Sequence, residues 1–152
     1  MHDCIFCKII SGEIPCVKIW EDENFIATLD IFPNTKGMTL LIPKKHYDSD
    51  LFNIDDEFYV KYFLTAKKIV QLLKKGLGVS RVAMVMEGMG VNHAHIKFYP
   101  LYGLESGWEK HLAKEEIYFD QYEGYISTQL GPKADLKELQ KIAEEIKLGT
   151  GN

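Results

Sequence analysis

The residues best suited to chemistry lie in the stretch 92–98, where two histidines and a lysine alternate with apolar residues. Because alternation with a period of two is typical of a half-buried strand, His93, His95 and Lys97 are expected on one face. Two imidazoles and an ammonium in one row can hold a metal ion, bind a phosphate, or attack one. The alternative is a strand whose solvent-facing side simply carries histidines. The apolar residues between them are expected in a core: Ala94, Ile96 and Phe98.

A second group of candidate ligands begins with Cys4 and Cys7, two thiols on one turn at a spacing that zinc ligands commonly use. His46, which follows an expected strand end, and His93 could complete a tetrahedral Cys2His2 site. The separations along the chain are far longer than in a zinc finger, so two alternatives stay open, a redox Cys-x-x-Cys pair and two unrelated buried cysteines. A redox pair usually opens a helix after a strand, and no strand is expected before Cys4, which disfavours the redox interpretation. Cys16 is expected to be a free thiol.

The bulk composition is that of an ordinary globular domain. The 152 residues suit one domain with a real core, and 46% of them are hydrophobic and 26% charged. A net charge of −4 gives no general electrostatic reason to bind nucleic acid or an anionic membrane, so neither is expected as a partner. No apolar run approaches the roughly 18 residues of a membrane span, and no signal peptide is recognised. Three cysteines disfavour a disulfide scaffold, and a cytoplasmic protein with reduced thiols is expected. His2 and His111 are expected at the surface.

The elements that must position these residues follow from hydrophobic periodicity. A long helix is expected over 55–77, because apolar residues recur along it at spacings of three and four, and Gly76 and Gly78 are expected to end it. A second amphipathic helix is expected over 135–148, capped by Asp135. The apolar stripe of the long helix comprises Tyr59, Phe63, Ala66, Val70, Leu73 and Leu77. The inward side of the second comprises Leu136, Leu139, Ala143 and Ile146.

The remaining expected elements are short. They are a helical turn at 4–10, a hairpin of 17–20 and 25–29, and strands at 38–42, 81–86 and 123–130. This order of strands, long helix, strands and helix indicates an α+β fold with a mostly antiparallel sheet, one long central helix and a C-terminal helix. We expect a single domain over 1–152, with residues 102–152 as a C-terminal extension packed on it.

Four motifs also occur in a specific order. They are the segment 4–15 with its two cysteines, Asp30 before a loop at Pro33, the segment 41–46 ending in His46, and His93 with His95. Together they resemble the histidine triad (HIT) family of nucleotide hydrolases and transferases. The match runs from Cys4 to about Leu101, which is two thirds of the chain.

The resemblance implies roles for particular residues. In zinc-bearing members, the residues that match Cys4, Cys7, His46 and His93 bind one structural Zn²⁺ per chain. The residue matching His95 is the family's nucleophile. The residue matching Asp30 holds the ribose hydroxyls of a nucleotide, here expected to be a purine nucleotide or a conjugate of one. Family members are typically homodimers, which implies two sheets that meet across a two-fold axis.

The rest of the nucleotide site is expected from the residues themselves. Lys97 and the backbone N–H groups of Gly88, Met89 and Gly90 are placed to stabilise charge on a phosphate. Asp30 would bias the site toward ribonucleotides. The base is expected to pack on apolar side chains near the first strands: Ile5, Phe6, Phe25 and Ile31.

The chain also departs from the family's pattern at four positions. Lys97 stands where the family has its third histidine, and Gly90 stands where a phosphate-side Ser or Thr is usual. Met38 replaces a histidine after Gly37, and Met86 replaces an asparagine. The departures at Met86 and Gly90 concern leaving-group protonation and substrate choice, whereas a cation at Lys97 can still hold phosphate oxygens.

Three functions are therefore compatible with the sequence. The first is a hydrolase in which His95 attacks the α-phosphorus of a dinucleoside polyphosphate or nucleoside phosphoramidate, forms a nucleotidyl-histidine, and releases a nucleoside monophosphate. The second is a nucleotidyl transferase or phosphorylase that uses the same chemistry with another acceptor. The third is a nucleotide-binding module with weak or vestigial catalysis.

Overall fold

The computed structural model describes residues 3–104 and 107–149. The chain divides into two compact units, Met1–Trp108 (the N-terminal unit) and Glu109–Asn152 (the C-terminal unit). His2 lies outside the described residues, whereas His111 is exposed, as expected. In the part of the chain that is described, no helix is both long enough and apolar enough to cross a membrane.

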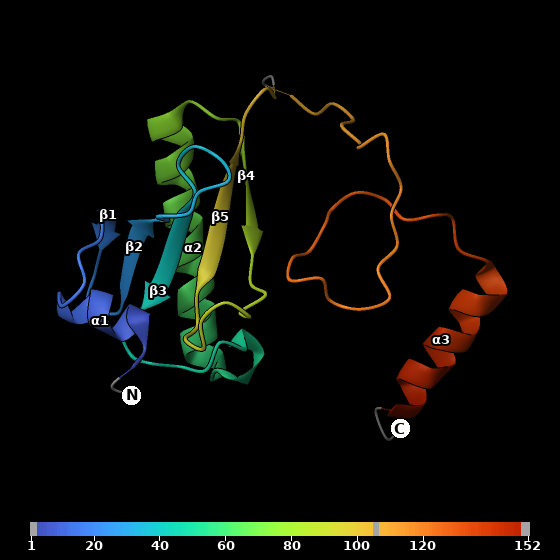
Figure 1. Cartoon of the computed structure of the whole chain (residues 1–152), viewed down its shortest axis with the longest axis horizontal. Helices are drawn as coiled ribbons and strands as arrows, with labels where there is room; N and C mark the ends of the chain where they lie inside the picture. The colour runs from blue at the N-terminus through green and yellow to red at the C-terminus, as the bar shows by residue number, and fades with distance from the viewer. Residues whose placement is uncertain (1–2, 105–106, 150–152) are drawn as a thin grey trace. The chain divides into compact units, whose positions relative to one another are not determined.

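The N-terminal unit is built on a five-stranded antiparallel sheet with the strand order β1-β2-β3-β5-β4 (Figure 1). Its strands are β1 (Lys18–Glu21), β2 (Phe25–Leu29), β3 (Thr39–Pro43), β4 (Arg81–Val85) and β5 (Ile96–Leu101). The hairpin, β3 and β4 agree with the sequence-based expectations. In contrast, β5 begins at Ile96, so the expected strand over 92–98 is wrong in its first half. Backbone groups of this half bond elsewhere: the Ala94 N–H donates to the Tyr47 carbonyl at 3.0 Å.

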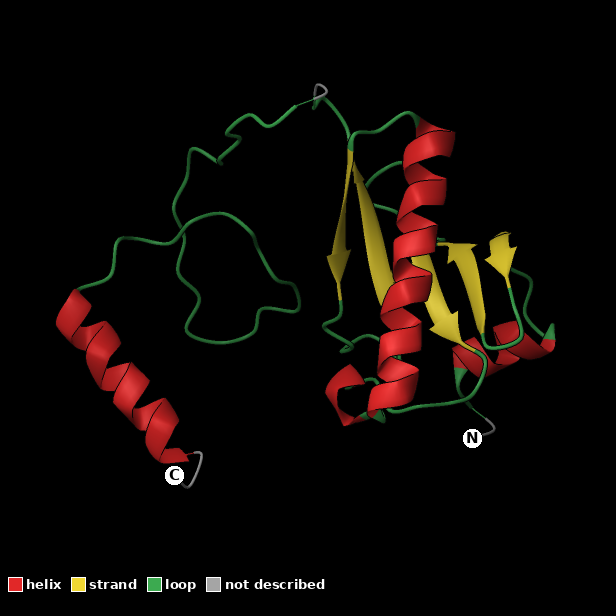
Figure 2. Cartoon of the chain, turned by 180° about the vertical axis from the view of Figure 1, so that it is seen from behind, coloured by secondary structure: helices red, strands yellow, loops and turns green. Residues whose placement is uncertain are grey.

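Two helices cover opposite faces of this sheet. The long helix α2 (Asp56–Leu77) crosses one face and the short helix α1 (Ile5–Ser11) lies on the other (Figures 1 and 2). Asp55 caps α2 by accepting from the Phe58 N–H at 2.9 Å, and Gly78 ends it in the left-handed conformation at φ 66°. Gly76 lies inside α2, so only one of the two glycines ends the helix. A 3-10 turn, η1 (Leu51–Asn53), precedes α2.

The buried side of α2 is rotated from the predicted stripe. The residues of α2 that are fully buried are Tyr62, Thr65, Ala66, Ile69 and Leu73. Four of the predicted positions, Tyr59, Phe63, Val70 and Leu77, are only half-buried. Both sets recur at helical spacing on adjacent sides of the helix, so periodicity alone could not separate them. Tyr62 shows which side faces the sheet, because its hydroxyl donates to the Leu41 carbonyl at 2.6 Å.

Alternation along the strands divides the core into two layers. On β3, Leu41 joins the layer under α2, whereas Leu40 and Ile42 join the layer under α1. The layer under α2 also contains Ala94, Ile96 and Phe98, as the sequence predicted. On β5, the residues that point away from α2 are half-buried or exposed, and Lys97 is one of them.

The C-terminal unit contains the helix α3 (Leu136–Gly149). Asp135 caps it, because its Oδ1 accepts from the N–H groups of Lys137 and Glu138 at 2.9 and 3.3 Å. The strand expected at 123–130 is wrong: none of these residues is in a strand. Bonds from the Ile117 N–H to the Leu130 carbonyl and from the Gln129 Nε2 to the Glu115 carbonyl close this segment as a loop instead. On α3, Leu136 is 79% exposed and the predicted inward side is exposed throughout, so the packing of 102–152 stays a prediction.

Candidate functional site

Four side chains that could hold a metal ion meet at one end of the sheet. Cys4 precedes α1 and Cys7 lies within it, His46 follows β3, and His93 precedes β5. Their ligand atoms all lie within 4.8 Å of one another. The structure therefore brings together the same four residues that the sequence grouped as ligands.

The distances in this cluster agree with a tetrahedral ion. The Cys4 and Cys7 Sγ atoms lie 3.4 and 3.6 Å from the His93 Nδ1, and the Cys7 Sγ lies 3.3 Å from the His46 Nδ1. An ion with metal–sulfur bonds of about 2.3 Å and metal–nitrogen bonds of about 2.05 Å has a sulfur–nitrogen edge of about 3.6 Å. The residues present therefore fit a four-coordinate metal ion.

The ring of His93 is held as a metal ligand would require. Its Nε2–H donates to the Pro43 carbonyl at 2.9 Å, which leaves Nδ1 unprotonated and directed at the two sulfurs. Burial lowers the pKa of His93, which favours the neutral imidazole that binds metal ions. Burial raises the pKa of the Cys7 thiol, and the neighbouring Cys4 raises it further. A cation between the sulfurs would offset both causes by stabilising the thiolates.

The second histidine, His95, has a different environment. Its Nδ1–H donates to the His93 carbonyl at 2.8 Å, which fixes the tautomer. Every fully buried side-chain nitrogen or oxygen of the described residues has a hydrogen-bond partner. Since no bond to Nε2 of His95 is found among these residues, this nitrogen reaches accessible space, although only 2% of the residue is exposed.

The charge state of His95 follows from its surroundings. Burial lowers the pKa of His95, and the Lys97 charge lowers it further. The hydrogen bond to the His93 carbonyl and the charges of Glu87 and Asp30 act in the opposite direction, but burial dominates. The ring is therefore neutral at neutral pH, with a lone pair on Nε2.

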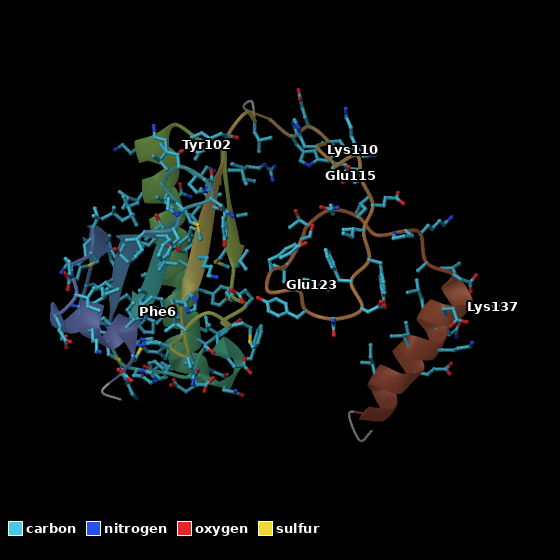
Figure 3. The ribbon with its side chains drawn as sticks, viewed as in Figure 1. Phe6, Tyr102, Lys110, Glu115, Glu123 and Lys137 are labelled. Carbon is cyan, nitrogen blue, oxygen red and sulfur yellow. The ribbon has the colours of Figure 1, made fainter. Side chains whose placement is uncertain are left out.

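His95 lines a cavity of about 310 Å³ on the α1 face of the sheet. Phe6 reaches from α1 over the sheet (Figure 3), and its ring packs edge-on against His93 and His95 at centroid distances of 5.8 and 5.1 Å. Most of the lining is apolar, and it includes Ile5, Phe6, Ile9, Ile31, Leu40 and Val91. This size and lining are typical of a site for a small molecule.

The polar residues of the cavity are few. Asp30, Lys97 and Gly90 line it beside His95. One carboxylate oxygen of Asp30 accepts from the Phe32 N–H at 2.8 Å, and its other oxygen has no partner among the described residues. Asp30 therefore retains one acceptor for a ligand hydroxyl.

Three expected nucleotide contacts are not part of the lining. Phe25 is fully buried in the layer under α2, because alternation along β2 points it away from the cavity. Gly88 and Met89 precede the part of the loop that reaches the cavity. The Met89 N–H donates to Glu87 Oε2 at 3.0 Å and is not directed at a ligand.

Sequence reasoning missed several residues of this site, among them Glu87 and Cys16. Glu87 accepts from the Lys97 ammonium at 2.5 Å, and Cys16 lines the cavity with its thiol free. The signal for Glu87 lies in the strand register, in which Val85 pairs with Lys97 across β4 and β5 and Glu87 follows two residues later. Side chains two residues apart point to the same face, which brings Glu87 within reach of Lys97.

Comparison with known proteins agrees with this geometry. A family model described as HIT domain matches residues 11–102. An uncharacterized HIT-like protein of Methanocaldococcus jannaschii is 45% identical over 104 residues, covering 65% of this chain and 79% of that protein. An adenosine 5'-monophosphoramidase of Schizosaccharomyces pombe is 36% identical over 125 residues, covering 75% and 90%.

A crystal structure of a HIT family member from Bacillus subtilis matches with a TM-score of 0.65 and 30% identity, covering 95% of each chain. The chain therefore belongs to the HIT domain family.

Proposed function

We propose that this HIT-domain protein is a nucleotide hydrolase in which His95 attacks the α-phosphorus of a nucleotide conjugate and releases a nucleoside monophosphate. The ring of His95 carries the proposal. Its Nδ1–H is bound to the His93 carbonyl at 2.8 Å, and its Nε2 is accessible at a cavity of suitable size. A fixed, neutral imidazole with one free nitrogen is a competent nucleophile at neutral pH. The similarity to a protein named as an adenosine 5'-monophosphoramidase supports this class of reaction.

The reaction takes place in two displacements. In the first, a bond forms between His95 Nε2 and phosphorus while the bond from phosphorus to the leaving group breaks, and the leaving group takes the electron pair and a proton from solvent. In the second, water attacks phosphorus and the phosphorus–nitrogen bond breaks, which regenerates neutral His95 and frees a proton to solvent. Splitting one displacement into two easier ones is the advantage of a covalent intermediate.

The neighbouring polar groups have separate roles in this scheme. Lys97 stabilises the charge that develops on the non-bridging phosphate oxygens. Asp30 accepts from the ribose hydroxyls through its free oxygen, which favours ribonucleotides. The apolar walls from α1 and the segment after β2 enclose the base, for which Phe6 and Ile31 are the proposed contacts.

We further propose that the cluster of Cys4, Cys7, His46 and His93 binds one Zn²⁺. Two thiolates and two imidazoles are a donor set that zinc favours. All four positions of a tetrahedron would be filled by protein, so the ion would be structural and would link α1 to the sheet.

A second copy of the chain is the proposed partner. The strand β4 forms one edge of the sheet, and its sequence is mostly apolar, with Met84 39% exposed. An apolar edge strand is a template for pairing with another chain, so two copies could form one continuous sheet. Sedimentation of the full chain should therefore give the mass of a homodimer, and a monomer at micromolar concentration would contradict this assignment.

The test of the proposed function is AMP release from adenosine 5'-phosphoramidate and from diadenosine tetraphosphate. The wild type should release AMP from at least one of them, and His95→Ala should lose at least about a thousandfold in kcat, because the covalent route is removed. The exposed His111→Ala variant is the control and should keep wild-type rates. Binding of AMP without release from either substrate would contradict hydrolysis and favour a transferase or a binding module.

A further inference from the structure

Glu87 makes two contacts beside the cavity that the proposed mechanism does not use. Its Oε1 accepts from the Lys97 Nζ at 2.5 Å, and its Oε2 accepts from the Met89 N–H at 3.0 Å. The two side chains of the ion pair are only 15% and 22% exposed. Glu87 therefore contacts both groups that the sequence suggested for binding phosphate, the lysine and the glycine-bearing loop.

The cavity has little positive charge left for an anion. Among the described residues that line it, Lys97 is the only Lys or Arg. Glu87, which lies beside the lining and is not part of it, neutralises that charge, and Asp30 contributes a carboxylate at the lining itself. Lys97, Glu87 and Asp30 together carry one more negative than positive charge.

The loop does not make up for this deficit. A backbone N–H aimed at a phosphate oxygen would be an alternative source of stabilisation. The Met89 N–H, however, is already donated to Glu87. The loop is also held in place, since Gly88 has φ 68° and a Cβ on it would lie 2.7 Å from the Ser49 carbonyl oxygen. Glu87 thus occupies two of the donors that a highly charged phosphate chain could use, the Lys97 ammonium and the Met89 N–H.

We propose that Glu87 is a specificity-determining residue, which restricts the cavity to nucleotides with a singly charged α-phosphate and a leaving group that brings no further negative charge. This inference rests on the proposed nucleotide site. Each added negative charge on a ligand meets a net negative charge from these residues in a partly desolvated cavity, where like charges repel more strongly than in water. Polyphosphates are therefore disfavoured, whereas phosphoramidates and simple phosphodiesters are accepted.

The experiment measures binding by calorimetry, which does not depend on turnover. The probes are the methyl ester of AMP, which carries one negative charge, and ATP without added divalent cations. In the wild type the methyl ester should bind more tightly than ATP. In Glu87→Gln, the affinity for ATP relative to the methyl ester should rise about tenfold, because the carboxylate charge is lost.

Two variants separate charge from structure. Glu87→Asp keeps the carboxylate and should keep the wild-type preference within about threefold. Glu23→Gln removes the same charge from an exposed turn and should leave the preference unchanged. If Glu87→Gln weakens both probes in parallel, or leaves their ratio unchanged, Glu87 only supports the loop and the proposal is wrong.

A measurement on the wild type alone covers the case in which Glu87→Gln does not fold. Raising the salt concentration from about 50 mM to about 500 mM should reduce the ratio of the affinity for the methyl ester to the affinity for ATP, because salt screens charges. A preference that does not respond to salt would overturn the inference. If the binding ratios are as expected but no AMP is released in the activity assay, the hydrolase assignment is contradicted and the role of Glu87 in binding still holds. Failure of both probes to bind would overturn the nucleotide site together with this inference.

Discussion

His93 and His95 lie two residues apart in one segment, yet they belong to two regions with different chemistry. Both rings donate one N–H to a backbone carbonyl, His93 to Pro43 and His95 to His93 itself. The regions differ in what faces the other nitrogen. For His93 it is two cysteine sulfurs within 3.6 Å, and for His95 it is an open cavity.

The helix α1 creates this difference. Its N-terminal turn carries the two cysteines to His93, and its apolar side chains form a wall of the cavity at His95. Phe6 lies between, with its ring against both imidazoles. One short helix therefore makes one histidine a candidate ligand and leaves its neighbour a candidate nucleophile. We call the cluster of Cys4, Cys7, His46 and His93 the metal region. The comparison predicts that substitutions in the metal region change the stability of the protein and that substitutions in the cavity change its activity.

The largest expected effect on stability is the loss of a metal ligand. His46→Ala should lower the metal content from about one per chain to well below that, and should destabilise the fold by about 3 kcal/mol or more, since metal binding is part of the folding free energy. His95→Ala should retain the metal. Metal analysis together with chemical unfolding checks both variants.

Cys16→Ser is the control for the metal region, because Cys16 is a free thiol outside the cluster and its loss should not change the metal content. If His46→Ala kept a full complement of metal, the four-ligand site would be wrong. Equal loss of metal from His46→Ala and His95→Ala would remove the distinction between the two regions.

A smaller effect is expected at the loop that carries Gly90 to the cavity. Gly88→Ala forces a Cβ to 2.7 Å from the Ser49 carbonyl oxygen at a backbone φ of 68°. This strain should cost about 2 kcal/mol and should raise KM, because the loop and its bond to Glu87 would shift. Thermal unfolding and steady-state kinetics would measure the two consequences, and an unchanged KM would show that the cavity tolerates movement of this loop.

The smallest expected effect is an increase in the free energy of unfolding, whereas the substitutions above lower it. Gly76 lies inside α2, and a Cβ added there meets no atom within 4 Å. Gly76→Ala should therefore stabilise the protein by about 1 kcal/mol, through the higher helix propensity of alanine. A destabilised Gly76→Ala in the same unfolding assay would show that this turn of α2 needs the glycine.

Much of the metal region and of the fold could be predicted from the sequence. Cys4 and Cys7 have a recognisable spacing, and His46 and His93, which are far away in the chain, were candidates to complete the set. The resemblance to the HIT family favoured this grouping over the alternatives. The elements around them followed from periodicity, because strand alternation and helical spacing are local properties. Membership of the HIT family and the α+β architecture are confirmed.

What the sequence could not supply depends on which face each element buries. Phe25 is apolar and near the cavity in the chain, but whether α1 or α2 covers its side of β2 is decided by tertiary packing. The same holds for the side of α2 that faces the sheet. Glu87 resembles an ordinary acidic residue before a glycine turn until the pairing of β4 and β5 brings it to Lys97.

The central claim is that His95 becomes covalently linked to the nucleotide while His93 does not. It is tested by mixing the protein rapidly with adenosine 5'-phosphoramidate, quenching in alkali, which preserves a phosphorus–nitrogen bond, and locating the adduct by peptide mass mapping. We expect one adenylyl group per chain on His95 during turnover and none in His95→Ala. Turnover by His95→Ala at a rate comparable to the wild type, or an adduct on another residue, would contradict the account.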